Sequence, residues 1–597
     1  MTPSSRRGVR LALGLTASLL ATTAFAQATD YRARLPQDEV TYFLMPDRFY
    51  NGDTANDTGG IPGGRLEHGF DPTHDGFYHG GDLAGVERRL DYVQGLGATA
   101  IWMAPIFKNK PVQGEPGREF AGSHGYWITD FTRVDPHFGD EAAMRALVEA
   151  AHARGMKVYM DIVTNHTADV IRYRECPSND CVYRSRADYP YTRRGGVEGE
   201  AINDGFTGWN FDRLTRPDYA YTPYVPAGEE TVKVPAWLND PAYYHNRGDT
   251  TFRGESSLDG DFAGLDDLMT EHPRVVEGMI EIYGDWIDRY QVDGFRIDTA
   301  RHVNPEFWRA FVPAMLARAE ANGIPNFHIF GEVYDVDPAV TARFTRVDGY
   351  PAVLDFGFQY TVTDIVARDV PPDRLAKVFA SDALYEGGEQ AALGLPTFLG
   401  NHDMGRIGGF IVKAKPDISD QELLARTTLA HALLMFSRGA PTLYYGDEQG
   451  FTGAGGYGAA RQDMADTQVA AYRRQRFVGG AQAAFSTEAP LYRAIADMAR
   501  LRQADVRLRR GLQTVRFAAE EPGLFAVSRR IPGEAGETLI VYNTSASPIT
   551  ANIEVDAGST DWSSSRGDCP TAATAPASVR VTVAAFDYLI CSSEGAR

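Results

Sequence analysis

The sequence predicts an α/β fold: a barrel of eight parallel strands and surrounding helices, an inserted subdomain after the third strand, and a C-terminal antiparallel β-sandwich. Short β-branched or aromatic runs alternate with amphipathic stretches from Val40 to about Tyr445, a pattern typical of a parallel sheet covered by helices. Roughly 100 residues between Asn165 and Asp267 are rich in Tyr, Gly, Pro and Arg and lack helical periodicity. Beyond about residue 503 the pattern changes to strand-like alternation.

Eight runs have the length and composition of strands. They are Val40–Met45, Ala98–Met103, Lys157–Val163, Gly294–Asp298, Phe327–Glu332, Val353–Phe356, Pro396–Leu399 and Thr442–Tyr445. Helical stretches fall between several of them: Glu141–Arg154 repeats apolar residues at helical spacing and stops at Gly155, and Pro273 and Pro305 each open another helix. Eight parallel strands with intervening helices predict a (β/α)8, or TIM, barrel.

The remaining segments give the expected domain boundaries. A structureless loop of about 100 residues is implausible in a compact domain, so the insert should form a small irregular subdomain at the barrel mouth. After a helix near Leu491–Arg502, three segments alternate like antiparallel strands: Val515–Arg530, Glu537–Val555 and Val579–Ile590. The expected units are a signal peptide at 1–26, two parts of the barrel at 30–164 and 268–503, the insert at 165–267 and the sandwich at 504–597.

The first 26 residues resemble an export signal. Three arginines precede the apolar run Leu11–Leu20, and Ala24-Phe25-Ala26 forms an A-x-A cleavage site. The 597-residue chain has a formal net charge of −20, which argues against nucleic acid as a partner. No second apolar run approaches the roughly 20 residues that span a bilayer. We therefore expect an exported protein, periplasmic or secreted, with no membrane association after signal removal. A monomer is the expected state.

The four cysteines fit an oxidising compartment. Cys176 and Cys181 lie in E-C-P-S-N-D-C, a spacing that can close a small loop, and Cys569 and Cys591 both lie near the C-terminus. Two local disulfides are the simplest interpretation. A metal site at the first pair is the alternative, although no further Cys or His residues cluster nearby in the sequence.

Polar residues stand at the ends of four predicted strands, where active sites of such barrels lie. The segments are D-I-V-T-N-H at 161–166, G-F-R-I-D at 294–298, F-H-I-F-G-E at 327–332 and F-L-G-N-H-D at 398–403. Asp298, Glu332 and Asp403 should therefore converge on one cavity. Two carboxylates that flank a glycosidic bond are the minimum apparatus for its hydrolysis. A single acid at a strand end could be a helix N-cap or a solvated residue, but all of them together favour catalysis.

With these motifs in order, the chain resembles the α-amylase family, glycoside hydrolase family 13, over roughly Asp38 to Cys591. D-I-V-T-N-H, G-F-R-I-D-T-A-R-H, G-E-V and F-L-G-N-H-D match four family segments. The resemblance implies that Asp298 is the catalytic nucleophile, that Glu332 is the general acid/base, and that Asp403 binds sugar hydroxyls as the ring distorts. It also implies retention through a covalent glycosyl-enzyme, with the two reacting carboxyl groups about 5–5.5 Å apart.

Seven further residues are expected to bind substrate. The resemblance and its motifs select His124, Tyr126, His166, Arg296, Arg301, His302 and His402. Arg296 precedes Asp298 by two residues, so both side chains should face the same side of the strand, where the guanidinium would keep the carboxylate ionised. Tyr126, within H-G-Y-W, is the implied stacking platform. Arg301 stands where the family often has Lys. Phe262 is either a further aromatic contact or a core residue.

Two sets of hard oxygen ligands predict calcium. The segment at 51–57 and the H-G-G-D turn at 79–82 resemble a calcium loop of the family. Its expected ligands are Asn51, Asp53, Asn56, Asp57, Gly80 and Asp82. An Asx-rich turn without metal is the alternative. The resemblance implies a second site, built from Asn165, Asp267 and the carbonyl of His302, which would tie the insert to the barrel.

The expected function is hydrolysis of α-1,4-glucosidic bonds in an α-glucan such as starch or maltooligosaccharides. Cyclomaltodextrinases, maltogenic amylases and cyclodextrin-forming 4-α-glucanotransferases share the machinery. The first two usually carry an N-terminal sandwich domain, whereas strand one begins 13 residues after the expected cleavage. The third usually carries further C-terminal domains, whereas about 90 residues follow Arg502. A non-catalytic relative is a different class, but such relatives typically lose part of the triad that is present here.

Overall fold

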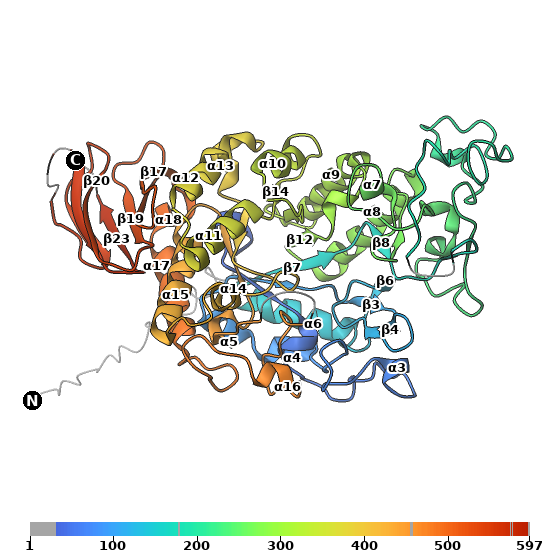
Figure 1. The fold of residues 1–597 in the computed structure, drawn as a ribbon, viewed down its shortest axis with the longest axis horizontal. Helices are drawn as coiled ribbons and strands as arrows, with labels where there is room; N and C mark the ends of the chain where they lie inside the picture. The colour runs from blue at the N-terminus through green and yellow to red at the C-terminus, as the bar shows by residue number, and fades with distance from the viewer. Residues whose placement is uncertain (1–30, 177–179, 454–457, 573–574, 576, 595–597) are drawn as a thin grey trace, which may run out of the picture.

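The computed structural model describes residues 31–176, 180–453, 458–572, 575 and 577–594, so the signal peptide expected at 1–26 lies outside the described residues. Eight strands form one sheet in which all paired neighbours are parallel. In chain order they are β1 (Thr41–Leu44), β2 (Ala100–Met103), β7 (Lys157–Ile162), β12 (Gly294–Ile297), β13 (His328–Gly331), β14 (Ala352–Val353), β15 (Pro396–Phe398) and β16 (Ala440–Tyr444). Their spatial order, β14-β13-β12-β7-β2-β1-β16-β15, follows the chain around a barrel (Figure 1).

The barrel is nearly closed. β14 and β15 are the edges of the sheet, and a backbone hydrogen bond of 3.0 Å from Asp355 N–H to the Pro396 carbonyl spans the gap between them. All eight predicted strands are confirmed, with ends that differ by a few residues. The sixth predicted strand, Val353–Phe356, was wrong at its C-terminal end, because β14 ends at Val353. Phe356 begins a helix, because Asp355 caps that helix by accepting a hydrogen bond from Phe358 N–H.

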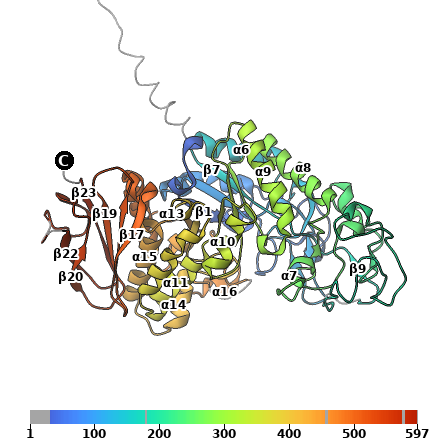
Figure 2. The same ribbon diagram turned by 90° about the horizontal axis from the view of Figure 1, so that it is seen from above.

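Helices surround the strands (Figures 1 and 2). The three that were predicted at Glu141, Pro273 and Pro305 are confirmed as α6 (Glu141–Ala153), α8 (Pro273–Tyr290) and α9 (Pro305–Ala321). The helix predicted near Leu491–Arg502 is confirmed as α17 (Pro490–Ala504). The other α-helices in the described ranges outside the insert are α2 (Pro46–Phe49), α3 (Arg65–His68), α4 (Leu83–Arg88), α5 (Leu90–Gly95), α10 (Pro338–Arg346), α11 (Phe356–Arg368), α12 (Asp373–Ala380), α13 (Gly388–Ala392), α14 (Ile407–Ala414), α15 (Asp420–Phe436), α16 (Ala470–Arg473) and α18 (Val506–Arg510). Short 3-10 helices are η1 (Tyr31–Ala33), η2 (Pro36–Asp38), η6 (Ala300–His302), η7 (Asp382–Leu384) and η8 (Asp447–Gln449).

The loop after β2 contains short antiparallel pairs that the sequence did not predict. They are β3 (Phe107–Asn109) with β6 (Ile128–Val134), and β4 (Val112–Gln113) with β5 (Phe120–Ala121). Between β5 and β6 this loop carries the H-G-Y-W segment, and the pairing of β3 with β6 fixes its position beside the barrel mouth.

Between β7 and α8 the chain forms an irregular insert, which Figure 1 shows at the end opposite to the C-terminal strands. Its elements are β8 (His166–Thr167), β9 (Arg172–Tyr173), η3 (Phe211–Arg213), β10 (Pro223–Tyr224), η4 (Ala236–Asn239), η5 (Pro241–Tyr243), α7 (Ser256–Asp259) and β11 (Asp266–Asp267). A small core of its own contains Tyr191, Ile202, Leu214, Tyr219, Ala220 and Met269. The first strand, β8, pairs with the last, β11, so both ends of the insert meet at the barrel.

The C-terminal region is the predicted antiparallel sandwich, in which a five-stranded sheet, ordered β17-β18-β19-β23-β21, faces the pair β20-β22. Its strands are β17 (Leu512–Ala518), β18 (Leu524–Arg530), β19 (Thr538–Asn543), β20 (Ile549–Glu554), β21 (Trp562–Arg566), β22 (Ser578–Val583) and β23 (Tyr588–Ser593). Alternate residues of β18 face opposite ways: Leu524 and Ala526 pack inside the sandwich, whereas Phe525 and Val527 join the barrel core. β21 was not predicted, because its W-S-S-S-R sequence has no apolar alternation.

Both expected disulfides are confirmed, Cys176–Cys181 and Cys569–Cys591. The first bond excludes the alternative of a metal site at that pair. None of the helices in the described parts of the chain combines the length and apolar composition that crossing a membrane requires.

Candidate active site

A cleft of about 850 Å³ lies at the carboxyl ends of the barrel strands. The three predicted catalytic carboxylates line it: Asp298, Glu332 and Asp403. Five predicted substrate-binding residues line it as well: His124, Tyr126, His166, Arg301 and His302. The other two lie directly behind the lining, since Arg296 contacts Asp298 and His402 contacts Tyr126. The fold therefore brings together every predicted catalytic and substrate-binding residue.

Arg296 connects the carboxylates at the floor of the cleft. It lies on β12 and is 1% exposed. Its Nη1 lies 2.9 Å from Asp298 Oδ1, and its Nη2 lies 3.0 Å from Glu332 Oε2. Nη1 also donates to both oxygens of Asp161, at 2.7 and 2.9 Å. One guanidinium therefore fixes the two predicted reacting carboxylates relative to each other.

The pKa values of these carboxyl groups are raised. Burial raises the pKa of Glu332, and Asp403 adds to the shift while Arg296 opposes it. Burial also raises the pKa of Asp298, opposed by Arg296 and reinforced by Glu332 and Asp161. For Asp161, burial raises the pKa to about 7. Burial raises the pKa of all three carboxyl groups and a single guanidinium opposes the shift, so the cluster retains protons at pH values where isolated carboxyl groups would be ionised. The prediction that Arg296 simply keeps Asp298 ionised was incomplete.

Two histidines stand in the site as neutral rings, since burial lowers the pKa of His166 and of His402 to about 3. His402 Nε2 lies 2.8 Å from the Tyr126 hydroxyl, and the two rings are nearly parallel at 5.5 Å between centroids. His124 Nδ1 accepts a hydrogen bond from Tyr126 N–H. His166 Nε2 is buried and has no hydrogen-bond partner within the described ranges. A neutral imidazole can donate or accept there, so His166 can bind a ligand hydroxyl.

Arg301 and His302 lie together at one side of the cleft. Arg301 Nη1 donates to the Tyr334 carbonyl at 2.9 Å. The His302 ring packs edge-to-face with Phe262, at 5.2 Å between centroids, and Phe262 packs in the same way against Phe252 at 5.3 Å. All five residues line the cleft, and the side chains of Phe252 and Tyr334 are 51% and 47% exposed. Phe262 is therefore part of an aromatic wall of the cleft as well as a packing residue.

Two charged residues near the catalytic carboxylates were missed by sequence reasoning, as were the aromatic lining residues Phe252 and Tyr334. Asp161 begins the D-I-V-T-N-H motif, and strand alternation could have placed it opposite Arg296, its partner in the β7–β12 pairing. Arg461 Nη2 lies 3.0 Å from Asp403 Oδ1, although the two residues are 58 positions apart. No local signal marks Arg461, because it belongs to none of the recognised motifs.

The segment at 51–57 folds against Asp82 in a way that suits calcium. The Asp82 carboxylate accepts hydrogen bonds from Gly52 N–H, Asp53 N–H and Asn56 Nδ2. Asn51 Nδ2 donates to Asp57 Oδ1, and a Cβ added to Gly80 would lie 2.6 Å from each of those two atoms. Asn51 Oδ1 and Asn56 Oδ1 are buried and have no hydrogen-bond partner in the described structure. Two unsatisfied amide oxygens fit a hard cation, while Asp53 also forms the Asx turn of the alternative by accepting from Ala55 N–H.

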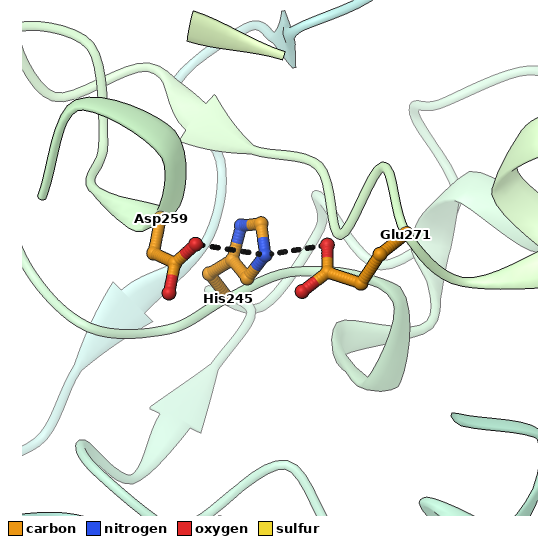
Figure 3. A group of neighbouring side chains, drawn as sticks. All are labelled: His245, Asp259 and Glu271. Carbon is orange, nitrogen blue, oxygen red and sulfur yellow. Dashed lines mark hydrogen bonds and ion pairs between the residues drawn. The ribbon is translucent and has the colours of Figure 1, made fainter. Parts of the chain in front are cut away.

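The second predicted calcium site fits less well. Asn165 Oδ1 is buried and unsatisfied among the described residues, as a ligand oxygen would be. Asp267, however, accepts a hydrogen bond from His245 Nδ1 at 2.6 Å, and His245 Nε2 lies 2.9 Å from Glu271 and 3.7 Å from Asp259 (Figure 3). Burial alone would lower the pKa of His245, but Glu271 and Asp259 hold it well above its ordinary value. An imidazolium ion thus already supplies positive charge to Asp267.

The chain is similar in sequence to known proteins. The family model "Alpha amylase, catalytic domain" matches residues 43–477. An α-amylase from Streptomyces lividans is 45% identical over 540 residues, which are 90% of this chain and 58% of that protein, so the chain spans less than two thirds of that relative.

Two solved structures resemble the fold. An α-amylase from Anoxybacillus has a TM-score of 0.68 at 26% identity, covering 94% of this chain and 99% of that one. A cyclomaltodextrin glucanotransferase with a three-domain ABC distribution, CldA, has a TM-score of 0.67 over the same shares of the two chains; at 23% identity it shows the fold alone. Because the family match covers most of the chain and the cleft holds the expected carboxylates, this chain belongs to the α-amylase family, glycoside hydrolase family 13.

Proposed function

We propose that the protein is a retaining glycosidase that hydrolyses α-1,4-glucosidic bonds of starch and maltooligosaccharides. The observation that carries this proposal is the pairing of both Asp298 and Glu332 with the guanidinium of Arg296, within a cleft that Asp403 also lines. A glycosidase of this kind needs two carboxyl groups in fixed relation on either side of the bond. The similarity to α-amylases over most of the chain supports the same function.

In the proposed reaction the proton of the pair is on Glu332 and Asp298 is ionised. The Asp298 carboxylate attacks the anomeric carbon while Glu332 donates its proton to the departing glycosidic oxygen. The C–O bond breaks as the ester bond to Asp298 forms. Glu332, now ionised, then takes a proton from water, whose oxygen displaces Asp298 and returns the carboxylate. Both donors to Glu332, Arg296 Nη2 and Thr299 N–H, go to Oε2. We therefore assign the proton that Glu332 transfers to its other oxygen, Oε1.

We assign the remaining residues to holding the sugar. Tyr126 offers its ring as a platform, and His166 and His402, neutral because of burial, can exchange hydrogen bonds with sugar hydroxyls. Arg301 and His302 are assigned to the side on which the leaving group departs, together with the aromatic wall of Phe252, Phe262 and Tyr334. Because exposed aromatic rings can stack against sugars, this wall could hold a second glucan chain. Either that chain or water could then accept the glycosyl group from Asp298.

A 4-α-glucanotransferase is therefore the second candidate. The exposed rings of Phe252 and Tyr334 favour it, because they could hold an acceptor sugar against the glycosyl-enzyme. The number of domains does not argue against it, since the structural likeness includes a three-domain cyclomaltodextrin glucanotransferase. A product time course on starch, maltoheptaose, pullulan and β-cyclodextrin separates the two. Net release of reducing ends supports hydrolysis, whereas longer or cyclic products without such release support transfer.

Four further points belong to this proposal. Calcium would be held by the oxygens at 51–57 and 80–82, where it would supply a structural cross-link. A second ion at Asn165, Asp267 and the His302 carbonyl would have to compete with His245 for Asp267. We propose export, which the two disulfides support, and a monomeric protein without nucleic-acid or membrane partners. We also propose the domain boundaries expected from the sequence: a signal peptide at 1–26, the barrel at 30–164 and 268–503, the insert at 165–267 and the sandwich at 504–597.

A reducing-sugar assay on soluble starch tests the proposed function. Wild-type protein should release reducing ends, and Asp298→Asn, purified in the same way, should release them several orders of magnitude more slowly. Equal and negligible release by both proteins would instead support a binding-only relative.

A further inference from the structure

Arg461 is bound to the loop that carries Asp403. It is 4% exposed, yet it lines the cleft. Its Nη2 lies 3.0 Å from Asp403 Oδ1, and its Nε donates to the carbonyl of His402 at 3.1 Å. One side chain thus contacts two consecutive residues, both of which belong to the predicted sugar-binding set. The Asp403 side chain is itself 45% exposed, so few other contacts restrict its rotation.

We propose that Arg461 is a positioning residue for Asp403, which fixes the carboxylate so that Oδ2 faces the bound sugar. This inference rests on the proposed function. Arg461 occupies Oδ1, and Oδ2 is the oxygen on the side of His402, 3.5 Å from its Nε2. A fixed orientation matters because a carboxylate that binds a distorted ring must be in place before the ring distorts.

A second buried arginine holds Arg461 in place. Arg406, three residues after Asp403 in the chain, is fully buried. It donates from Nε to Gln462 Oε1 at 2.6 Å and from Nη2 to the Ala460 carbonyl at 3.3 Å. These are the two neighbours of Arg461 in the sequence. Two arginines therefore hold the two loops together: Arg461 binds the loop of Asp403, and Arg406, from that loop, binds the residues on either side of Arg461.

The lowered pKa of Asp403 agrees with this geometry. Partial desolvation in the cleft would raise the pKa of Asp403, but His402, Arg461 and Arg296 together lower it. His402 is neutral above about pH 3, so at neutral pH the guanidiniums supply the positive charge. Arg461 thereby keeps Asp403 in the acceptor form that binding of sugar hydroxyls needs.

A double-mutant cycle tests the proposal. All four proteins of the cycle are assayed with α-maltosyl fluoride. Arg461→Ala alone should lower kcat about 10- to 100-fold, the range expected for one charge-assisted hydrogen bond, with a smaller change in KM. In the Asp403→Asn background, on the same substrate, the same substitution should cost less than about threefold. The acid limb of the pH–rate profile should also move to higher pH in Arg461→Ala. Arg474→Ala, an exposed arginine on the same chain segment, is the matched control and should change neither quantity.

Two results would overturn the proposal. An equal loss in both backgrounds would mean that Arg461 contacts sugar directly, and an unchanged kcat in Arg461→Ala would mean that it has no role in the reaction. If Arg461→Ala does not fold, Arg461→Lys keeps the charge but reaches one acceptor at a time, and the same cycle applies to it. The proposed function is tested by a different comparison. It would be contradicted if the wild type had no more activity than Asp298→Asn, whatever the result for Arg461→Ala.

Discussion

Asp161 and Arg296 stand opposite each other on paired strands, β7 and β12, and Arg296 Nη1 lies within 2.9 Å of both oxygens of Asp161. Asp161 is also an acceptor for Trp102 Nε1 and for the Tyr126 hydroxyl, each at 3.1 Å. These donors come from different strands and loops of the barrel. Asp161 therefore orients the guanidinium on which Asp298 and Glu332 depend, and it does so from a position that the sheet register determines.

The first prediction concerns this support. Asp161→Asn keeps the shape of the side chain but removes its negative charge and replaces one acceptor oxygen with an NH₂ group. That NH₂ group faces either the Arg296 guanidinium or the donors of Trp102 and Tyr126. We expect kcat/KM on maltoheptaose to fall about 10- to 100-fold, because the orientation of Arg296 is lost. Asp140→Asn, at the exposed N-cap of α6, is the control, since Asn and Asp cap helices equally well. A variant as active as the control would show that the sheet alone orients Arg296.

The barrel was predictable because its strands are short, apolar and followed by polar residues. Asp298 and Glu332 directly follow β12 and β13, so placing the strands also placed these carboxylates at one rim. Strand alternation likewise predicted that Arg296 would reach Asp298. The sandwich was predictable because all of its strands except β21 lie in segments with strand-like alternation, over six or seven residues each.

Other features could not be predicted, because they depend on contacts between distant segments. Arg461 reaches Asp403 across 58 residues, and His245 reaches Asp267 only after the insert has folded back on itself. Neither arginine nor histidine carries a local signal for such a partner. The raised pKa of Asp298 could not be predicted from the sequence either, since it depends first on the burial of the carboxyl group and then on the neighbouring Glu332 and Asp161.

The second prediction separates the roles of Asp298 and Glu332. Glu332→Gln should nearly abolish starch hydrolysis but retain attack on α-maltosyl fluoride, because fluoride leaves without a proton. Asp298→Asn should be slow on both substrates, because the nucleophile is needed whatever departs. The Glu332 variant also lacks the base for the second step, so a covalent adduct on Asp298 should accumulate and be visible by mass spectrometry. An adduct on Asp403, or equal loss of both reactions in Glu332→Gln, would contradict this division of roles.

The third prediction concerns the oxygens of Asn51 and Asn56. If they hold calcium only in the folded protein, chelation must lower stability, by about 2.7 kcal/mol for an ion present at 100 times its Kd. The melting temperature should fall in EDTA, and elemental analysis should find calcium. Asn56→Ala should reduce the effect of EDTA, whereas Asn552→Ala, an exposed residue of β20, should leave it unchanged. A melting temperature indifferent to EDTA, with no calcium present, would leave the Asx turn as the whole explanation.

The fourth prediction concerns stability in acid and uses His328, which lies at the start of β13, away from the cleft lining. Burial lowers its pKa to about 3, whereas an unfolded histidine has a pKa near 6.5. Between these values the unfolded chain binds a proton that the folded protein does not. Stability therefore falls as the pH falls from about 6.5 towards 3, and the loss reaches about 2 kcal/mol at pH 5.

Other groups titrate in the same range, and the raised pKa values of Asp161 and Asp298 act with the opposite sign. Only a difference between two proteins isolates His328. Urea denaturation of the wild type and of His328→Gln, followed by tryptophan fluorescence at pH 7.5 and pH 5, provides it. Gln does not titrate, so the variant should gain about 2 kcal/mol relative to the wild type between the two pH values, whatever its stability at pH 7.5. A difference in unfolding free energy that does not change with pH would mean that His328 has the same pKa in the folded protein as in the unfolded chain.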